Sequence, residues 1–381
     1  MATIVDGKKR IPFLRGMLAH YLIEQGFAFQ DAYGLAERVR RSLQKAKEVS
    51  AKDMADIVRT QIKKQFGDRT LGDGVFWEPR SQQLFVEDEQ NRLFFSLEHL
   101  ADSLTAIGLD HDLSHRIARL VQQEILSTDE QVVKRNEVFK YTQKVVKREC
   151  GADYAERYEA WYRFRNDTHH QPLIVLIGGA SGVGKTSAGV ALANHLKISR
   201  VVSTDAIRQI MRLMISPELM PALHASSYEA WKHIGAISPN QSSPVVQAFR
   251  EQALRVCVGV RAMIERAIEE NTSVIVDGVH VLPDLIDLKK FENKAIFVWI
   301  NFYLEDEKQY AQRFKIRGQS APQRSSHRYI ENLNAILEIQ RHILGVGETH
   351  HVPIVENTNF EETVQSVSQQ IMDVLRKVYK S

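Results

Sequence analysis

A glycine-rich segment with a lysine and a threonine is the part of this sequence whose chemistry is clearest. It reads GASGVGKT at residues 179–186 and follows the apolar run PLIVLI at 172–177. Glycines let consecutive backbone N–H groups turn toward phosphate oxygens, an approach that a Cβ would obstruct. In G-x-x-x-x-G-K-[ST] loops the lysine meets the β- and γ-phosphates and the hydroxyl binds Mg²⁺. The segment predicts a site for ATP and Mg²⁺; the alternative is a structural glycine turn.

Individual residues of this loop have predicted roles. Lys185 is expected to act in catalysis by neutralising charge on the transferring phosphoryl group, and Thr186 to bind the metal ion. The helical stretch SAGVALANHL comes next, so the loop should lead from a strand into a helix. The predicted nucleotide contacts are Gly179, Ala180, Ser181, Gly182, Val183, Gly184, Lys185, Thr186 and Ser187.

Two acidic residues follow other predicted strands. Asp205 lies in VVSTDAIRQIMR, where a carboxylate would hold or deprotonate an attacking hydroxyl and so touch the substrate. Asp277 ends the apolar run SVIVD, the Walker B arrangement in which a carboxylate holds a Mg²⁺ water. The structural alternatives are a helix cap, by Thr204 or Asp205, and a turn aspartate at Asp277.

Two pairs of arginines have helical spacing. Arg208 and Arg212 lie four residues apart, so they could together bind an anionic acceptor. Arg313 and Arg317 lie four apart in a helix expected to end at Gly318, and are predicted to fold over the transferring phosphoryl group as a catalytic lid. The alternative for both pairs is an ordinary solvated helix face.

Three further polar residues are weaker candidates. His280, in GVHVLP, is predicted to contact the substrate, although a lone histidine is more often structural. Asn357 and Asn359 follow the run HVPIVE and could touch adenine, with helix capping as the alternative.

The elements that must position these residues begin after a polar linker at 165–171. Short apolar runs alternate with helical stretches, which is typical of a parallel sheet with crossover helices. With the glycine-rich loop, we therefore expect an α/β P-loop domain with five parallel strands, helices on both faces and the site beyond the carboxyl ends of the strands. The predicted strands are 172–177, the pair of valines at 201, 273–277, 295–302 and 351–356.

Residues 1–166 contain apolar residues at three- and four-residue spacing and predict an all-helical region. A shift of 82 residues aligns Leu18 with Leu100, Gly26 with Gly108 and Val39 with Val121. Each glycine should end a helix in a left-handed conformation, and each copy should continue into a third helix, near 51–66 and 129–149. The pattern predicts a duplication; the alternative is a chance match between amphipathic helices.

Composition excludes several classes of protein. The 381 residues carry a net charge of only +3, which disfavours nucleic-acid binding, and two cysteines cannot build a disulfide framework. No run approaches 18 uncharged apolar residues, and the N-terminus lacks the apolar core of a secretory signal. We expect a cytoplasmic protein with no membrane or nucleic-acid partner; a homo-oligomer formed through the helical region is left open.

Several segments resemble the 2-phosphoglycerate kinases best known from archaea. They are PFLRGMLAHYLIEQGFAFQDAYGLAERVRRSL near the N-terminus, ERYEAWYRFR, IGGASGVGKTSAG, STDAIRQIMRLMISPELMPALHASSYEAW, FREQALRVCVGVRAMIERAIEENTSVIVDGVHVLP and the HVPIVENTN ending. The resemblance implies transfer of the ATP γ-phosphoryl group to the 3-hydroxyl of 2-phosphoglycerate. It also implies that the helical region is similar to an ATP-cone. With the 82-residue repeat, we expect ATP-cone-like copies at 1–90 and 91–166, followed by an α/β P-loop kinase domain at 171–381.

The acceptor in such a reaction carries a phosphate and a carboxylate, so it needs cations and hydrogen-bond donors. The candidates in or near Ser203–Trp231 are Arg208, Arg212, His224, Ser226, Ser227, Tyr228 and Lys232. The alternative is a packed helical hairpin with Tyr228 and Trp231 in its core. Two features depart from the family pattern: the acid in SVIVDG is Asp277 where Glu is expected more often, and the second helical copy is additional.

Two other functions stay open at this point. One is a kinase for another phosphorylated acid or polyol, of the mevalonate phosphate or inositol phosphate type. The other is a nucleotide-sensing regulator whose P-loop domain changes shape with little turnover.

Overall fold

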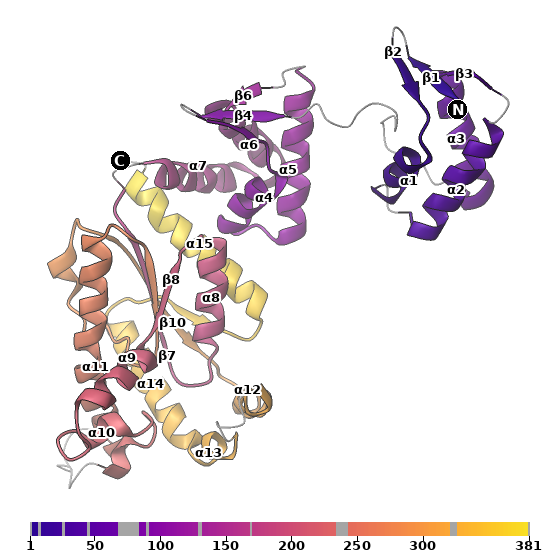
Figure 1. Cartoon of the computed structure of the whole chain (residues 1–381). Coiled ribbons are helices and arrows are strands. Elements are labelled where there is room, and N and C mark those ends of the chain that lie inside the picture. Colours follow the sequence, from indigo (N-terminus) through magenta and orange to yellow (C-terminus); the bar gives the residue numbers. More distant parts are fainter. Residues whose placement is uncertain are drawn as a thin grey trace. The chain divides into compact units, whose positions relative to one another are not determined.

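The computed structural model divides into two compact units (Figure 1). One contains residues 1–95 and 129–133, and the other contains 96–128 and 134–381. The structure describes residues 2–6, 9–24, 27–43, 46–67, 84–88, 91–128, 132–167, 170–233, 243–320 and 326–379.

A five-stranded parallel sheet forms the centre of the second unit, as the apolar runs predict. Its spatial order is β11-β10-β7-β9-β8, and every pair of neighbours is parallel. All residues of the central strand β7 are buried, because helices cover both faces. The chain reverses its strand order at β7, which places a crevice at the carboxyl edge. The strands are β7 (Leu173–Gly179), β8 (Arg200–Ser203), β9 (Val274–Asp277), β10 (Ile296–Tyr303) and β11 (Ile354–Glu356).

Helices pack on both faces of this sheet. Figure 1 shows α8 and α15 on one face and α11 and α14 on the other. The predicted lid helix α12 does not end at Gly318 but continues to Ser320. The helices are α8 (Lys185–His195), α9 (Thr204–Met214), α10 (Pro221–His224), α11 (Pro244–Glu269), α12 (Glu307–Ser320), α13 (Ser326–Glu331), α14 (Leu333–Thr349) and α15 (Phe360–Tyr379), with 3₁₀ turns at Ala230–His233 and Leu288–Phe291.

Four helices of the predicted second copy belong to the same unit as this sheet. They are α4 (Leu97–Ala106), α5 (His111–Leu126), α6 (Arg135–Cys150) and α7 (Ala152–Asn166). Helix α7 packs along α15, and α4 contacts α8. Gly108 has a left-handed φ of +90° after α4, as predicted, and a Cβ there would lie 2.6 Å from the Gln369 side chain.

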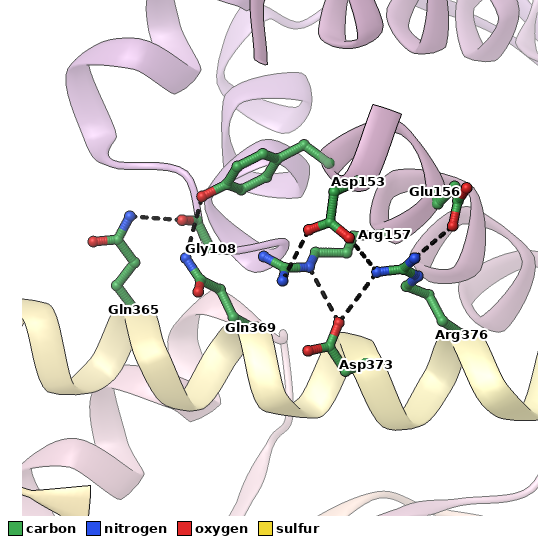
Figure 2. A network of polar contacts seen from close by, with 9 residues as sticks. Gly108, Asp153, Glu156, Arg157, Gln365, Gln369, Asp373 and Arg376 are labelled. Atoms are coloured by element: carbon green, nitrogen blue, oxygen red, sulfur yellow. Dashed lines mark hydrogen bonds and ion pairs between the residues drawn. The ribbon is translucent and has the colours of Figure 1, made fainter. Parts of the chain in front are cut away.

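Charged side chains line the contact between α7 and α15 (Figure 2). Arg376 of α15 pairs with Asp153 at 2.5 Å and also with Glu156. Arg157 of α7 reaches Asp373 at 3.3 Å. This contact joins the last helix of the predicted second copy to the last helix of the chain that the structure describes.

The first unit contains two three-stranded sheets, of order β2-β1-β3 and β5-β4-β6. Sequence periodicity predicted only helices here; the strands were missed because each has three or four residues, too few to show alternation. The elements are β1 (Thr3–Asp6), β2 (Lys9–Pro12), α1 (Arg15–Glu24), α2 (Phe29–Ser42), β3 (Glu48–Ser50), α3 (Ala51–Phe66), β4 (Phe85–Asp88) and β5 (Asn91–Phe94), with most of β6 (Val132–Lys134).

The order of elements along the chain agrees with a duplication. The series β-β-α-α-β-α occurs from β1 to α3 and again from β4 to α6. The aligned pairs Leu18 with Leu100 and Val39 with Val121 are buried in both copies. The third helix of the second copy begins at Arg135 rather than near 129, because β6 precedes it. Gly26 lies outside the described residues, and the three-part domain division stays a prediction.

Among the described residues, every helix is too short or too polar to cross a lipid bilayer.

Candidate active site

The glycine-rich loop joins β7 to α8 and has a backbone that glycine alone adopts readily. Gly182 and Gly184 have φ of +94° and +90°. Space is also restricted, because a Cβ on Gly182 would lie 2.7 Å from the Phe314 ring and one on Gly184 would lie 2.4 Å from Asn357 Nδ2. Helix α8 begins at Lys185, so its N-terminal N–H groups and the positive end of its dipole face the loop. This geometry is that of an anion cradle.

A cavity of about 660 Å³ opens over this loop at the carboxyl edge of the sheet. It collects Asp205, Asp277, Arg313 and Asn357, which sequence motifs far apart along the chain had indicated separately. The lining residues are Ser181, Gly182, Gly184, Lys185, Thr186, Ser187, Ser203, Asp205, Asp277, Gly278, Val279, Arg313, Phe314, Ile316, Asn357 and Phe360.

Thr186 and Asp277 form the part of the cavity that suits a metal ion. The Thr186 hydroxyl donates to Asp277 Oδ2 at 2.7 Å. The other oxygen of Asp277, Oδ1, is buried and has no hydrogen-bond partner among the described residues. Burial raises the pKa of Asp277 because it disfavours the carboxylate, so a nearby cation would stabilise it. A hydroxyl and a carboxylate are hard oxygen ligands, and this pair therefore fits Mg²⁺.

Lys185 lies in the floor of the cavity. Its side chain is buried, and its Nζ donates to the carbonyl oxygen of Ala180 at 2.7 Å. That hydrogen bond holds the ammonium inside the glycine-rich loop. The amine thus lies within the loop and lines the cavity, and its contact with phosphate stays a prediction.

Asp205 is in the first turn of α9 and faces the cavity. Ser203 caps this helix, since its Oγ accepts from the backbone N–H of Ala206 at 3.1 Å. The Asp205 carboxylate is therefore not used as the cap; its Oδ1 lies 3.5 Å from Arg208 Nε, and 61% of the side chain is exposed. Burial opposes its charge, but the positive charges of Arg208 and Lys185 help to hold the pKa of Asp205 below its usual value. The ionised carboxylate can accept a hydrogen bond from an acceptor hydroxyl.

Arg313 joins α12 to the loop and to the segment that follows β11. It donates to the carbonyl oxygens of Val183, at 3.2 Å, and of Asn357. Asn357 Nδ2 donates to the same Val183 oxygen at 2.7 Å. Asn359 caps α15, because its Oδ1 accepts from the N–H of Glu361 at 3.1 Å, and it does not line the cavity. Arg317 lies in α12, with its side chain outside the described residues.

Most candidate acceptor residues lie in residues 221–232, which we call the acceptor segment, or on the neighbouring helix α9, whereas His280 follows β9. None of them except Asp205 lines the cavity. The ring of His224 contacts Ile215 O at 2.8 Å, and Lys232 Nζ donates to Asn332 at 3.1 Å. Arg212 donates to Gln209 at 2.9 Å.

The acceptor segment is closely packed, in line with the hairpin alternative. Ser227 and Tyr228 are buried, and burial raises the pKa of Tyr228 to about 12, whereas Ser226 is half-buried. Trp231 is 38% exposed and so is not a core residue. The substrate-binding roles of this segment stay predictions.

Sequence reasoning missed several residues of the cavity. Phe314, Ile316 and Phe360 line it, and Ile316 and Phe360 are exposed apolar side chains. Each lies within three residues of a predicted site residue, so adjacency to a motif was the available signal. Gly278 also lines the cavity; a Cβ there would lie 1.7 Å from Thr204 Oγ1.

Several 2-phosphoglycerate kinases are similar to this chain in sequence. No family model matches the chain. It is 35% identical over 299 residues to 2-phosphoglycerate kinase of Pyrococcus furiosus, which covers 78% of this chain and 96% of that protein. The Pyrococcus horikoshii enzyme is 36% identical over 287 residues (75% and 92%), and the Methanopyrus kandleri enzyme is 32% identical over 299 residues (78% and 90%). A solved structure of shikimate kinase from Acinetobacter baumannii with shikimate aligns at 15% identity and a TM-score of 0.32, covering 58% of this chain and 99% of that one.

Proposed function

Because the chain belongs to the 2-phosphoglycerate kinase family, we propose that it transfers the γ-phosphoryl group of ATP to the 3-hydroxyl of 2-phosphoglycerate, giving 2,3-bisphosphoglycerate and ADP. The observation that carries the proposal is the cavity that places Asp205 and Asp277 with the glycine-rich loop. A phosphoryl transfer needs a nucleotide cradle, a metal site and an acceptor-side base in one space.

The glycine-rich loop and Lys185 bind and orient the triphosphate in this proposal. Mg²⁺ would be held by Thr186 and Asp277, where it supplies charge neutralisation for the phosphates. Arg313 and Arg317 of α12 stabilise the negative charge that develops on the transferring group. Asn357, which lines the same cavity, is assigned to the nucleotide side.

Asp205 acts on the acceptor side. The attacking 3-hydroxyl donates a hydrogen bond to its carboxylate, and the proton passes to Asp205 as the new O–P bond forms and the bond to the ADP oxygen breaks. Its pKa, held low by neighbouring cations, keeps the carboxylate ionised at neutral pH. An acidic side chain facing the cavity favours chemistry over a purely sensing role.

The test is product analysis with a panel of acceptors. Purified protein, ATP and MgCl₂ are incubated with 2-phosphoglycerate, 3-phosphoglycerate, mevalonate phosphate and inositol phosphates, and products are read by ³¹P NMR. We expect a bisphosphoglycerate signal with 2-phosphoglycerate only. Turnover of another acid or polyol would reject this acceptor and keep the kinase; ATP binding without turnover of any acceptor would favour the sensing role.

A further inference from the structure

A chain of fully buried polar groups runs beside the cavity and connects α9 to the acceptor segment. Its members are Thr204, His280 and Gln252, each 0% exposed, and none of them lines the cavity. Thr204 Oγ1 lies 2.9 Å from His280 Nδ1, and His280 Nε2 lies 2.9 Å from Gln252 Oε1. Gln252 Nε2 donates to the carbonyl oxygens of Ala225, at 3.1 Å, and Ala222. We call this set the His280 network.

Each donor and acceptor in the network can be assigned in one way. The carbonyls of Ala222 and Ala225 only accept, so the Gln252 amide must present Nε2 to them and Oε1 to the imidazole. His280 therefore carries its proton on Nε2 and accepts from the Thr204 hydroxyl at Nδ1. Burial lowers the pKa of His280 to about 3, so the ring is neutral at physiological pH.

The two ends of the network are the two parts of the site that must be aligned. Thr204 begins α9 and immediately precedes Asp205. Ala222 and Ala225 lie in the acceptor segment, where Arg208 NH1 of α9 donates to Ala225 O at 2.9 Å and to Leu223 O at 3.0 Å. The segment is thus tied to α9 through backbone carbonyls, and the buried Ser227 hydroxyl adds a side-chain contact, 3.5 Å from His280 Nε2.

We propose that Gln252 and His280 are positioning residues that fix the acceptor segment relative to Asp205. The proposal rests on the proposed function only in taking this segment as the acceptor side. Neither residue touches the cavity, so they act through the geometry they impose. A displacement of about 1 Å between a base and its hydroxyl can cost about 100-fold in rate, whereas the nucleotide cradle on β7 and α8 would be unaffected.

The experiment compares three kinds of variant in the full chain. Gln252→Leu and Thr204→Val remove hydrogen bonds at either end of the network with little change in size. Thr204→Ser keeps the hydroxyl and is the rescue variant. Val256→Ala is the matched control, because Val256 is a buried apolar residue of the same helix α11 that makes no polar contact in the network. For each we measure kcat, the acceptor KM and the Kd of a non-hydrolysable ATP analogue.

We expect Gln252→Leu and Thr204→Val to lower kcat/KM for the acceptor by about ten-fold or more while the nucleotide Kd changes less than about two-fold. Thr204→Ser and Val256→Ala should stay close to wild type. Equal losses in nucleotide and acceptor binding, or an equal loss in Val256→Ala, would overturn the positioning role.

A second readout does not depend on the substrate. ¹⁵N NMR of the imidazole nitrogens in the unliganded protein reports the tautomer, with His280→Asn identifying the signal. Protonation on Nε2 alone supports the network, and protonation on Nδ1 or on both nitrogens overturns it. If the panel finds an acceptor other than 2-phosphoglycerate, the kinetic test uses that acceptor, so the two proposals fail separately.

Discussion

The second unit contains two polar networks that differ in almost every physical respect. The His280 network is neutral, fully buried and built on hydrogen bonds between uncharged side chains and backbone carbonyls. The network between α7 and α15, here called the exposed network, consists of ion pairs whose acids are 40–55% exposed and whose arginines, Arg157 and Arg376, are 11% and 20% exposed. A buried polar group left unpaired costs about 1–3 kcal/mol, whereas ion pairs that water reaches contribute about 0–1 kcal/mol and are screened by salt. The first network should control geometry at the site, and the second only the attachment of the helical region.

The largest expected effect is the loss of kcat when a residue of the glycine-rich loop is replaced. Lys185→Ala removes a charge that contacts phosphate through the transfer, so we expect kcat to fall by at least about 10³-fold. Lys197→Ala is the matched control, because this lysine follows α8 and is 51% exposed against Asp102. The measurement is kcat of both variants and of wild type in steady-state assays. Near-normal turnover of Lys185→Ala would contradict the loop's assigned role.

The next effect concerns Asp205. Asp205→Asn removes the base but keeps the shape of the side chain, so kcat should fall about 10²-fold or more while ATP affinity stays similar. Asp287→Asn, an exposed aspartate that caps the 3₁₀ turn at Leu288–Phe291, should be silent. Weaker ATP binding with unchanged turnover of bound substrate would place Asp205 on the nucleotide side instead.

The nucleotide side of the site could be predicted because its residues are encoded in short contiguous patterns. The loop at 179–186 and the strand ending at Asp277 can each be recognised from about eight consecutive residues. The five strands could be predicted for the same reason, since each is an apolar run between helical stretches. Parallel packing then forced their ends, and the polar residues there, into one cavity.

Asp205 was indicated by its own motif on the acceptor side, but the His280 network behind it could not be predicted in this way. Gln252 is separated from Thr204 by 48 residues and from His280 by 28, and only tertiary folding brings them together. One signal was present: Gln252 lies on the apolar face of α11, between the buried residues Phe249 and Val256. A polar side chain on a buried face requires a partner, but the sequence does not say which. In the exposed network, nothing in the sequence indicated that Asp153, Glu156 and Asp373 would pair with arginines across α7 and α15.

A third prediction concerns the His280 network and the pH dependence of the free energy of unfolding. Folding lowers the pKa of His280 from 6.5 to about 3, so the unfolded chain binds a proton that the native protein excludes between these values. Stability from this source is complete above pH 6.5 and decreases as the pH falls toward 3. At pH 5 the loss is about 2 kcal/mol. Urea unfolding at pH 7.5 and pH 5 should show this loss in wild type and not in His280→Asn; equal losses would contradict a neutral buried ring.

The smallest effect belongs to the exposed network. Arg376 contacts Asp153, Glu156 and Asp373, and Arg376→Met should lower the free energy of unfolding by about 1 kcal/mol, with kcat unchanged. Because the lost interaction is between charges, the difference from wild type should shrink when NaCl is raised from 0.05 to about 1 M, where the Debye length is about 3 Å. Arg266→Met, which removes an exposed pair with Glu270 on α11, is the control and should have no measurable effect. A salt-independent loss, or a loss of kcat in Arg376→Met, would mean that the contact between α7 and α15 is coupled to the site and that the two networks are less different than their burial implies.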